Sequence, residues 1–275
     1  MKIRRVSSIS LLLLLLTVTI NFYSCSDDSV TQGPEAPVTS TLIHLDSSYA
    51  IGGRALVSLY VEDSLHVGYN PVYVVLHDSV TGVLITDAHV EFDLLNHGHS
   101  TPVENPESNT AVDGKFKGAW ILNASQAGDN PLHWHYTVMV HNHEAPGEPE
   151  GAAEFSEFVV KEDPDGFKSI IMPDSTALYL SYITPRTPVT GANSFEFLIN
   201  KNEPELFPPD GTYTIEMTTE YLANGHTTTN NVNPVGNSIG HYNGTVNLDQ
   251  NGAWRIKLKL IKNTLSYDTY FDITY

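Results

Sequence analysis

Hydrophobic and polar residues alternate along most of the chain, in short runs bounded by Gly, Pro, Asn and Asp. This period of two is typical of antiparallel strands that bury one face, whereas the 3.6-residue period of amphipathic helices is hard to find. Seven strands are predicted in each half of the chain: 41–45, 54–62, 70–78, 87–95, 114–123, 132–141 and 153–160, then 168–172, 176–184, 193–200, 211–220, 240–249, 252–261 and 268–274. The pattern favours an all-β protein with two tandem immunoglobulin-like antiparallel β-sandwiches.

The second half repeats the landmarks of the first half in the same order. Matched positions lie 120 to 127 residues apart, which suits one β-domain that was duplicated. Features that both copies share indicate architecture, and features that only one copy carries are candidates for chemistry. The matched landmarks are Gly68 with Gly191, Asn70 with Asn193, Gly98-His99 with Gly225-His226, Gly114 with Gly240, Gly118 with Gly244, and Trp134 with Trp254.

A charged, turn-rich segment, Glu162 to Gly166, separates the two copies. We therefore expect a first, histidine-rich β-sandwich domain over residues 41–162 and a second β-sandwich domain over residues 163–275. Residues 25–40 are rich in Ser, Thr, Gly and Pro, a composition that buries no core and predicts a flexible tether.

The chain begins with the pattern of a signal peptide. Basic residues precede an apolar stretch, Ile9 to Ile20, which is too short to cross a bilayer as a stable helix. Cys25, the only cysteine, follows where the apolar stretch ends, and this arrangement resembles the lipobox of bacterial lipoproteins. We expect residues 1–24 to be a lipoprotein signal peptide and Cys25 to be lipidated. The alternative is a plain secreted protein with an accidental cysteine.

The composition and net charge of the chain exclude some classes of binding partner. The net charge is −18, and removal of residues 1–24 with their three basic residues makes it −21, a surface that repels nucleic acid. With its single cysteine assigned to lipid, the chain has neither disulfides nor a thiolate metal site. Asp27 and Asp28 after the cysteine resemble the surface-export signals of Bacteroidota-type lipoproteins. We expect an outer-membrane lipoprotein of the bacterial cell envelope, exposed at the surface and held to the membrane by its lipid.

The short motifs of both halves resemble the YtkA-like/FixH-like family of small extracytoplasmic β-sandwiches. The shared features are a Gly-x-Asn before a strand, a Gly-His segment, a Gly-aromatic-x-Gly strand and a tryptophan strand. This resemblance implies a link with copper handling and with the assembly of respiratory oxidases. The residues that carry it are Gly68, Asn70, Gly98, His99, Gly114, Phe116, Gly118 and Trp134 in the first half, and Gly191, Asn193, Gly225, His226, Gly240, Tyr242, Gly244, Gly252 and Trp254 in the second.

Histidines are the main candidates for chemistry. Six of the twelve form His-x-His pairs, all in the first half: His97 with His99, His133 with His135, and His141 with His143. Residues i and i+2 of a strand point to the same side, so each pair could converge on one ion, and neutral imidazole binds Cu(II) and Zn(II) well. We predict Cu or Zn ligation by His97, His99, His133 and His135, with His141 and His143 as accessory ligands beside the acidic segment 144–150.

The duplication supports this assignment. Along the strand 132–141, Trp134, Tyr136, Val138 and Val140 are expected to face the core, which turns His133, His135 and His141 outward. The aligned strand 252–261 keeps the inward residues but has Arg255, Lys257 and Lys259 outside, so the fold does not require histidines there. The opposing interpretation is an ordinary solvated face, on which any polar residue is tolerated. His241 is expected at the surface.

Two other functions compete with metal binding. The long loops 105–113 and 224–238 lie at the same end of each predicted sandwich, where they would form an adhesion or assembly surface for an envelope protein or a glycan. A metal-dependent enzyme is the third. His97, His99 and Glu104 have the spacing of a cupin metal site but lack its flanking glycines, and no Gly-x-Ser-x-Gly nucleophile motif is present. We therefore predict no catalytic activity.

Overall fold

The computed structural model describes residues 42–275 except 97, 126–133, 157 and 205. The predicted signal peptide, the lipidation site Cys25, the tether, and the predicted ligands His97 and His133 all lie outside the described residues. The described part of the chain contains eighteen strands and no helix, so the all-β prediction is confirmed. It accordingly holds no helix with the length and hydropathy of a membrane span. Residues 41–275 form one compact unit.

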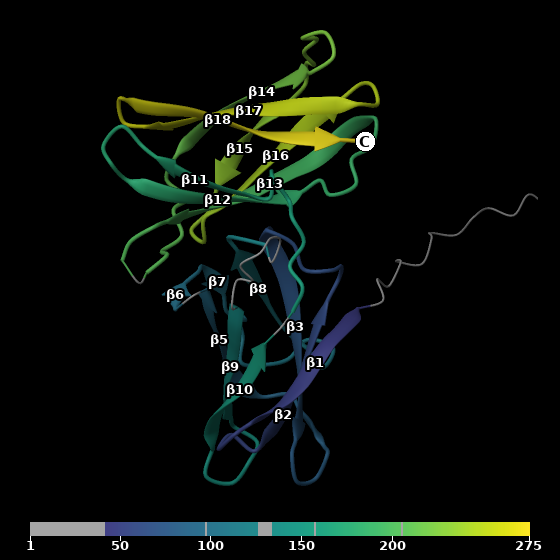
Figure 1. Cartoon of the computed structure of the whole chain (residues 1–275), viewed down its shortest axis with the longest axis vertical. Helices are drawn as coiled ribbons and strands as arrows, with labels where there is room; N and C mark the ends of the chain where they lie inside the picture. The colour runs from purple at the N-terminus through teal and green to yellow at the C-terminus, as the bar shows by residue number, and fades with distance from the viewer. Residues whose placement is uncertain (1–41, 97, 126–133, 157, 205) are drawn as a thin grey trace, which may run out of the picture. The chain divides into compact units, whose positions relative to one another are not determined.

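Ten strands form the first sandwich, which is coloured purple to teal in Figure 1. One sheet has the order β1-β2-β3-β8-β7, with β4 beside β3, and the other has the order β10-β9-β5-β6. The strands are β1 (Ile43–Ala50), β2 (Ala55–Val61), β3 (Gly68–Asp78), β4 (Leu84–Ile85), β5 (Ala88–Asn96), β6 (His99–Ser100), β7 (Val103–Glu104), β8 (Phe116–Leu122), β9 (Trp134–Asn142) and β10 (Glu150–Ser156).

Eight strands form the second sandwich, in green to yellow in Figure 1. Its sheets have the orders β11-β12-β13-β16-β15 and β14-β17-β18. The strands are β11 (Phe167–Ile171), β12 (Ala177–Thr184), β13 (Gly191–Lys201), β14 (Thr214–Tyr221), β15 (Val232–Gly236), β16 (His241–Leu248), β17 (Ala253–Lys262) and β18 (Leu265–Thr274).

The two sandwiches share one topology, as the repeat in the sequence predicts. The sheet β1-β2-β3-β8-β7 corresponds strand for strand to β11-β12-β13-β16-β15, and β10-β9-β5 corresponds to β18-β17-β14. Register extends the match to single residues. Trp134 of β9 pairs with Asn96 of β5, and Trp254 of β17 pairs with Tyr221 of β14. Exterior positions on the matched strands of one sandwich therefore have a definite counterpart in the other.

Each sandwich has its own hydrophobic core. The first is built from buried residues between Ala50 and Val160, and the second from buried residues between Ile170 and Ile273. The central strand β9 alternates between buried and more exposed positions as predicted, with Trp134 and Tyr136 among the buried ones, and β17 does the same. Burial of these large side chains supplies most of the driving force for folding.

The shared Gly-x-Asn landmark closes the loop before the third strand of each sandwich. Asn70 accepts a hydrogen bond from the backbone N–H of His66 and donates to the carbonyls of His66 and Gly68. Asn193 makes the same three bonds, to Val189 and Gly191. Both side chains are buried, so they satisfy backbone groups that water does not reach.

The shared glycines have equally specific causes. The glycines that begin β3 and β13 both have positive φ, +106° at Gly68 and +105° at Gly191, a region that L-residues rarely adopt. At Gly118 of β8 a Cβ would lie 2.3 Å from the carbonyl oxygen of Glu104, because β7 passes close by. At Gly244 of β16 it would lie 2.6 Å from the carbonyl oxygen of Val232 in β15. The sequence motif therefore records a close backbone approach in both copies.

The observed strands differ from the predicted ones at the edges. The last strand of the first half runs from Glu150 to Ser156, three residues earlier than predicted at its start. The short strands β4, β6, β7 and β15 were not predicted. Three of these have two residues each, and a pair of residues is too short to show a period of two.

Candidate functional site

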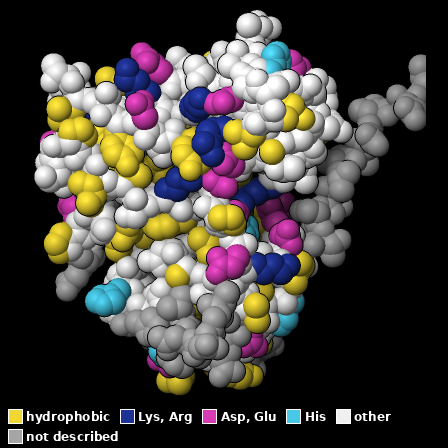
Figure 2. Space-filling view, turned by 45° about the horizontal axis from the view of Figure 1, so that its top comes forward, with side chains coloured by type: hydrophobic (Ala, Val, Ile, Leu, Met, Phe, Trp, Pro, Cys, Tyr) yellow, Lys and Arg dark blue, Asp and Glu magenta, His cyan; other side chains and the backbone are white. Residues whose placement is uncertain are grey.

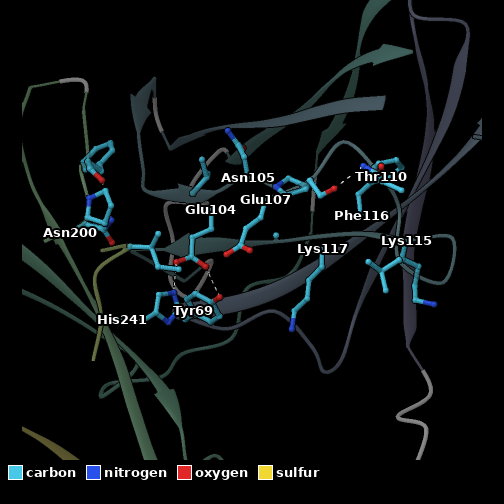
Figure 3. A pocket seen from close by; sticks show the side chains of 18 residues that line it. Tyr69, Glu104, Asn105, Glu107, Thr110, Lys115, Phe116, Lys117, Asn200 and His241 are labelled. Carbon is cyan, nitrogen blue, oxygen red and sulfur yellow. Dashed lines mark hydrogen bonds and ion pairs between the residues drawn. The ribbon is translucent and has the colours of Figure 1, made fainter. Parts of the chain in front are cut away.

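A cavity of about 620 Å³ lies between the first sheet of each sandwich. Its walls come from β3, β7 and β8 together with the loop 105–112 on one side, and from β13, β16 and the loop 207–209 on the other. Figure 3 shows the lining side chains from close by. The volume lies within the range of small-ligand sites. The loop 105–113, predicted as one half of a binding surface, forms part of this wall.

Strand register places the first-sandwich residues of the site on one sheet face. Glu104 pairs with Ala119, which pairs with Pro71, and Tyr69 pairs with Ile121 in the next outward row. Val72 and Val74 of the same strand point the other way, into the first core. Tyr69 and Glu104 therefore stand on the outer face of this sheet.

The second sandwich presents the matching outer face. Phe195, Phe197 and Ile199 of β13 enter the second core, so Glu196 and Asn200 point away from it. His241 of β16 pairs with Leu198 of β13, which places the imidazole diagonally opposite Glu196. The prediction that His241 lies at the surface is wrong, because only 9% of the residue is exposed.

Four side chains meet at one end of the cavity and form what we call the junction network: Tyr69, Glu104, Glu196 and His241. The Nε2 atom of His241 lies 2.6 Å from Oε1 of Glu104, and its Nδ1 atom lies 2.7 Å from Oε1 of Glu196. The Tyr69 hydroxyl donates to Oε2 of Glu104 over 2.6 Å. Figure 3 shows Glu104 reaching toward both His241 and Tyr69. One carboxylate thus joins the two sandwiches.

The network fixes the protonation state of the imidazole. Both ring nitrogens face carboxylate oxygens, and only the doubly protonated ring donates from both. Burial by itself lowers the pKa of His241, but the hydrogen bonds and negative charges of Glu104 and Glu196 outweigh it and raise the pKa to about 9. Burial, followed by the charge of Glu104, raises the pKa of Tyr69, so this hydroxyl keeps its proton and donates.

This arrangement suits binding better than proton transfer. A general base needs a nitrogen free to accept a proton, and both nitrogens of His241 are already committed as donors. The protonated ring of His241 is held between two carboxylates in a site that solvent reaches poorly. The network therefore stabilises the contact between the two sandwiches at the cavity wall.

Asn200 lines the cavity and has one side-chain atom without a hydrogen-bond partner in the described structure. Its Nδ2 atom donates to the carbonyl of Phe207, whereas its buried Oδ1 atom has no partner among the described residues. Asn200 is only 4% exposed, so bulk solvent reaches it poorly. An unpaired buried acceptor is unfavourable, so this atom lowers the stability of the cavity wall.

The rest of the rim is mixed in character. Val112 is 73% exposed and Ile239 is 45% exposed, and both line the cavity with Pro106 and Pro209. Lys117 and Glu107 add one charge of each sign at exposed positions. The cavity therefore offers aliphatic contact together with a few polar anchors, the usual composition of a binding site.

The predicted histidine ligands lie at two ends of the sheet β10-β9-β5-β6. His135 is an outward residue near the start of β9, and His141 is an outward residue near its end. Six residues of strand separate them, a distance of roughly 20 Å. His99 of β6 pairs with Asn96, in the row of the inward-facing Trp134, and so does not share the face of His135. A single ion cannot contact all the described members of the set.

No group of three or more His, Cys, Asp or Glu side chains within the described ranges is arranged to hold a metal ion. On the face shown in Figure 2, histidines are scattered rather than clustered. His97 and His133 lie outside the described residues, so metal binding by their pairs stays a prediction. His141 and His143 do come together, with ring centroids 4.7 Å apart.

The sequence did not predict most of the residues of the junction network. Glu104 drew attention only through its spacing from His97 and His99, yet its partner is His241, 137 residues away. One signal was present. By the registers of the repeat, Tyr69, Glu104, Glu196 and His241 correspond to Ala192, Val232, Tyr73 and Lys115, so each is carried by one copy alone.

Comparisons with known proteins add little. The sequence matches no known family model, so the resemblance to YtkA-like/FixH-like proteins stays a prediction. It also matches no curated protein. Among solved structures, the chain is similar to the tandem immunoglobulin domains A164–A165 of titin, with 9% sequence identity and a TM-score of 0.20 over 84% of this chain and 98% of the titin chain. A likeness this distant carries no argument about function.

Proposed function

We propose that this protein is a lipid-anchored, non-enzymatic binding module of the bacterial cell envelope, whose junction cavity holds a peptide segment of a partner protein. The observation that carries the proposal is the cavity of about 620 Å³, whose wall combines an aliphatic rim with the polar side chains of Asn200 and the junction network. A peptide backbone both donates and accepts hydrogen bonds and so suits such a wall. The resemblance of the first 25 residues to a lipoprotein leader supports the anchor.

The rim favours a peptide with aliphatic side chains. Val112, Ile239 and Pro209 present aliphatic surface, and Phe207 uses one ring face to stack on Tyr179, with centroids 5.7 Å apart. The net charge of −18 further favours a peptide with basic flanking residues, through faster encounter more than through affinity.

Selection of displayed peptides on the full chain, purified in detergent, tests the cavity. Peptides enriched on the wild type should bind the Ile239→Glu variant at least about tenfold more weakly, because a buried carboxylate would face their apolar side chains. Val80→Glu is the matched control, since Val80 is 77% exposed in a loop that does not line the cavity. Equal losses in both variants, or no enrichment on the wild type, would refute the cavity as the binding site.

The anchor has its own test. Metabolic labelling with a fatty acid should mark the wild-type chain in its bacterial host and leave the Cys25→Ser variant unmarked, because Cys25 is the only cysteine. Labelling that persists in the variant would contradict lipidation at this residue without bearing on the cavity.

A further inference from the structure

The exterior of the second sheet of the first sandwich carries an unusual row of side chains across three neighbouring strands. His89 of β5 pairs with His141 of β9, and His141 pairs with Glu150 of β10. All three belong to the outward set of their strands, since Val90, Val140 and Ala153 enter the core. Directly paired residues of adjacent strands have Cβ atoms about 5 Å apart, so these three side chains share one small patch.

The side chains around this row already interact as ligand-like groups. The Nδ1 atom of His141 lies 3.5 Å from Oε1 of Glu150, and its Nε2 atom lies 3.9 Å from Oε2 of Glu148. The ring of His143 stands edge-on to that of His141, at a centroid distance of 4.7 Å. The patch thus brings imidazole and carboxylate groups together.

A hollow of about 340 Å³ lies over the row. His89, Glu91, His141 and Glu150 line its sides, and Met139, Gly151 and Ala152 are among its other lining residues. The small residues of β10 leave room above the sheet for an ion and its water. The hollow is separate from the junction cavity, with which it shares no lining residue.

The second sandwich provides an internal control for this row. The corresponding positions of β14, β17 and β18 are Thr214, Ile261 and Ser266, which pair with one another in the same register. None of these three is a usual ligand for a transition metal. The β-sandwich therefore does not require His, His and Glu at these positions, and only the first copy carries them.

We propose that His89, His141 and Glu150 form a binding site for Zn²⁺, with water or a neighbouring carboxylate in the fourth position. Two imidazoles and one carboxylate from three elements, with one open position, are a recurrent zinc ligand set. In the structure these three side chains are not arranged around one point, because His89 hydrogen-bonds Glu91 and Asn109 over 2.9 and 3.1 Å, so zinc binding requires its ring to turn toward His141. These exposed contacts are weak and offer little resistance to that rotation.

The site differs from the one expected from the sequence. His141 and His143 were assigned as accessory ligands, whereas here His141 is central and its main partners, His89 and Glu150, come from other strands. His-x-His spacing emphasises neighbours along one strand, but the row runs across the sheet, and only the strand register reveals it.

Calorimetric titration of the full chain with ZnCl₂ tests the proposal. We expect binding with a Kd of about 10 µM or tighter, weakened at least about tenfold by His141→Ala. His44→Ala is the matched control, because His44 is an exposed histidine of β1 that does not line the hollow, and the affinity of this variant should equal that of the wild type. CaCl₂ in excess should not displace the zinc, since calcium prefers oxygen ligands.

A gain of function provides the second arm. The combined change Thr214→His, Ile261→His and Ser266→Glu should raise the stoichiometry from one zinc to two, because it copies the row into the second sandwich. Circular dichroism would verify that this variant and His141→Ala remain folded. Absence of zinc binding in the wild type, unchanged affinity in His141→Ala, or displacement by calcium would each overturn the proposal. None of these results depends on peptide binding at the junction cavity.

Discussion

Strands β9 and β17 occupy the same place in their sandwiches, agree on one face and differ on the other. Inward, Trp134 and Trp254 are both buried in their cores. Outward, β9 presents His135 and His141, whereas β17 presents Arg255 and Lys257. Arg255 pairs with Asp272, and Lys257 contacts Glu220, so the second exterior is occupied by ion pairs within its own sheet. The first exterior carries contacts between imidazole and carboxylate groups in their place, such as those of His141 with Glu148 and Glu150.

The junction network likewise combines an architecture that both sandwiches share with side chains that differ between them. Each sandwich uses the outer face of its corresponding sheet, but the residues are complementary rather than alike: Glu104 on one side and His241 on the other. A duplicated fold offers two equivalent surfaces, and unlike substitutions on them create a defined contact between the copies. Architecture is thus shared, and chemistry is specific to each copy.

Substitution of the shared asparagines tests the architectural half of this comparison and should have the largest effect. Asn70→Ala and Asn193→Ala should each lower the free energy of unfolding by roughly 2–4 kcal/mol. Each substitution leaves one backbone N–H and two backbone carbonyls of a buried loop without a hydrogen-bond partner. Urea denaturation measures both. Because the two residues make the same three bonds, the two losses should agree within about 1 kcal/mol.

Asn243→Ala is the control for these variants. Asn243 is exposed on β16, and its side chain makes no hydrogen bond within the described structure, so its loss should change stability by less than about 0.5 kcal/mol. A large cost at one of the buried asparagines and none at the other would mean that the shared motif serves different roles in the two copies.

The pH dependence of stability tests the half that is specific to each copy. The pKa of His241 is raised from 6.5 to about 9 in the folded protein, so its stabilising contribution is complete below about pH 6.5 and is lost as the pH rises through 9. The stability difference between the wild type and His241→Gln should therefore shrink by about 2–3 kcal/mol between pH 6 and pH 10.

His226→Gln separates this effect from that of an ordinary ion pair. His226 contacts Asp249 over 2.7 Å, but both side chains are more than 40% exposed, so the loss at pH 7 should be below about 1 kcal/mol. A constant difference between the wild type and His241→Gln across the pH range would show that the buried ring is not held as a cation.

The sequence predicted the strands and loops that recur along the chain, but it did not predict the contacts between residues on different strands and sheets. The alternation of β9 and the Gly-x-Asn landmark identified strands and shared loops correctly, because both signals lie within a few residues. The burial of His241 depends on Glu104, which only the packing of two sheets brings near. Likewise, the row of His89, His141 and Glu150 follows from strand register, which alternation alone does not specify.

A second pair of asparagines also escaped the sequence analysis, and it leads to the smallest expected effect. Asn105, next to β7, accepts a hydrogen bond from the backbone N–H of Phe92 over 2.8 Å, and Asn233 of β15 accepts one from that of Met217 over 2.9 Å. Phe92 and Met217 are counterparts in the aligned registers of β5 and β14. Each asparagine therefore covers a free N–H of a strand in the opposite sheet.

Asn105→Ala and Asn233→Ala should each reduce the free energy of unfolding by about 1 kcal/mol, the usual net value of one hydrogen bond. Asn→Asp at the same positions keeps an acceptor oxygen and should restore most of the loss, which a purely steric role would not do. Hydrogen exchange provides the site-specific measurement, since the amides of Phe92 and Met217 should lose protection in the alanine variants and regain it in the aspartate variants. If only one of the two amides loses protection, the hydrogen bond from asparagine to the opposite sheet matters in a single copy. The rule that the two copies share their architecture would then fail at this position.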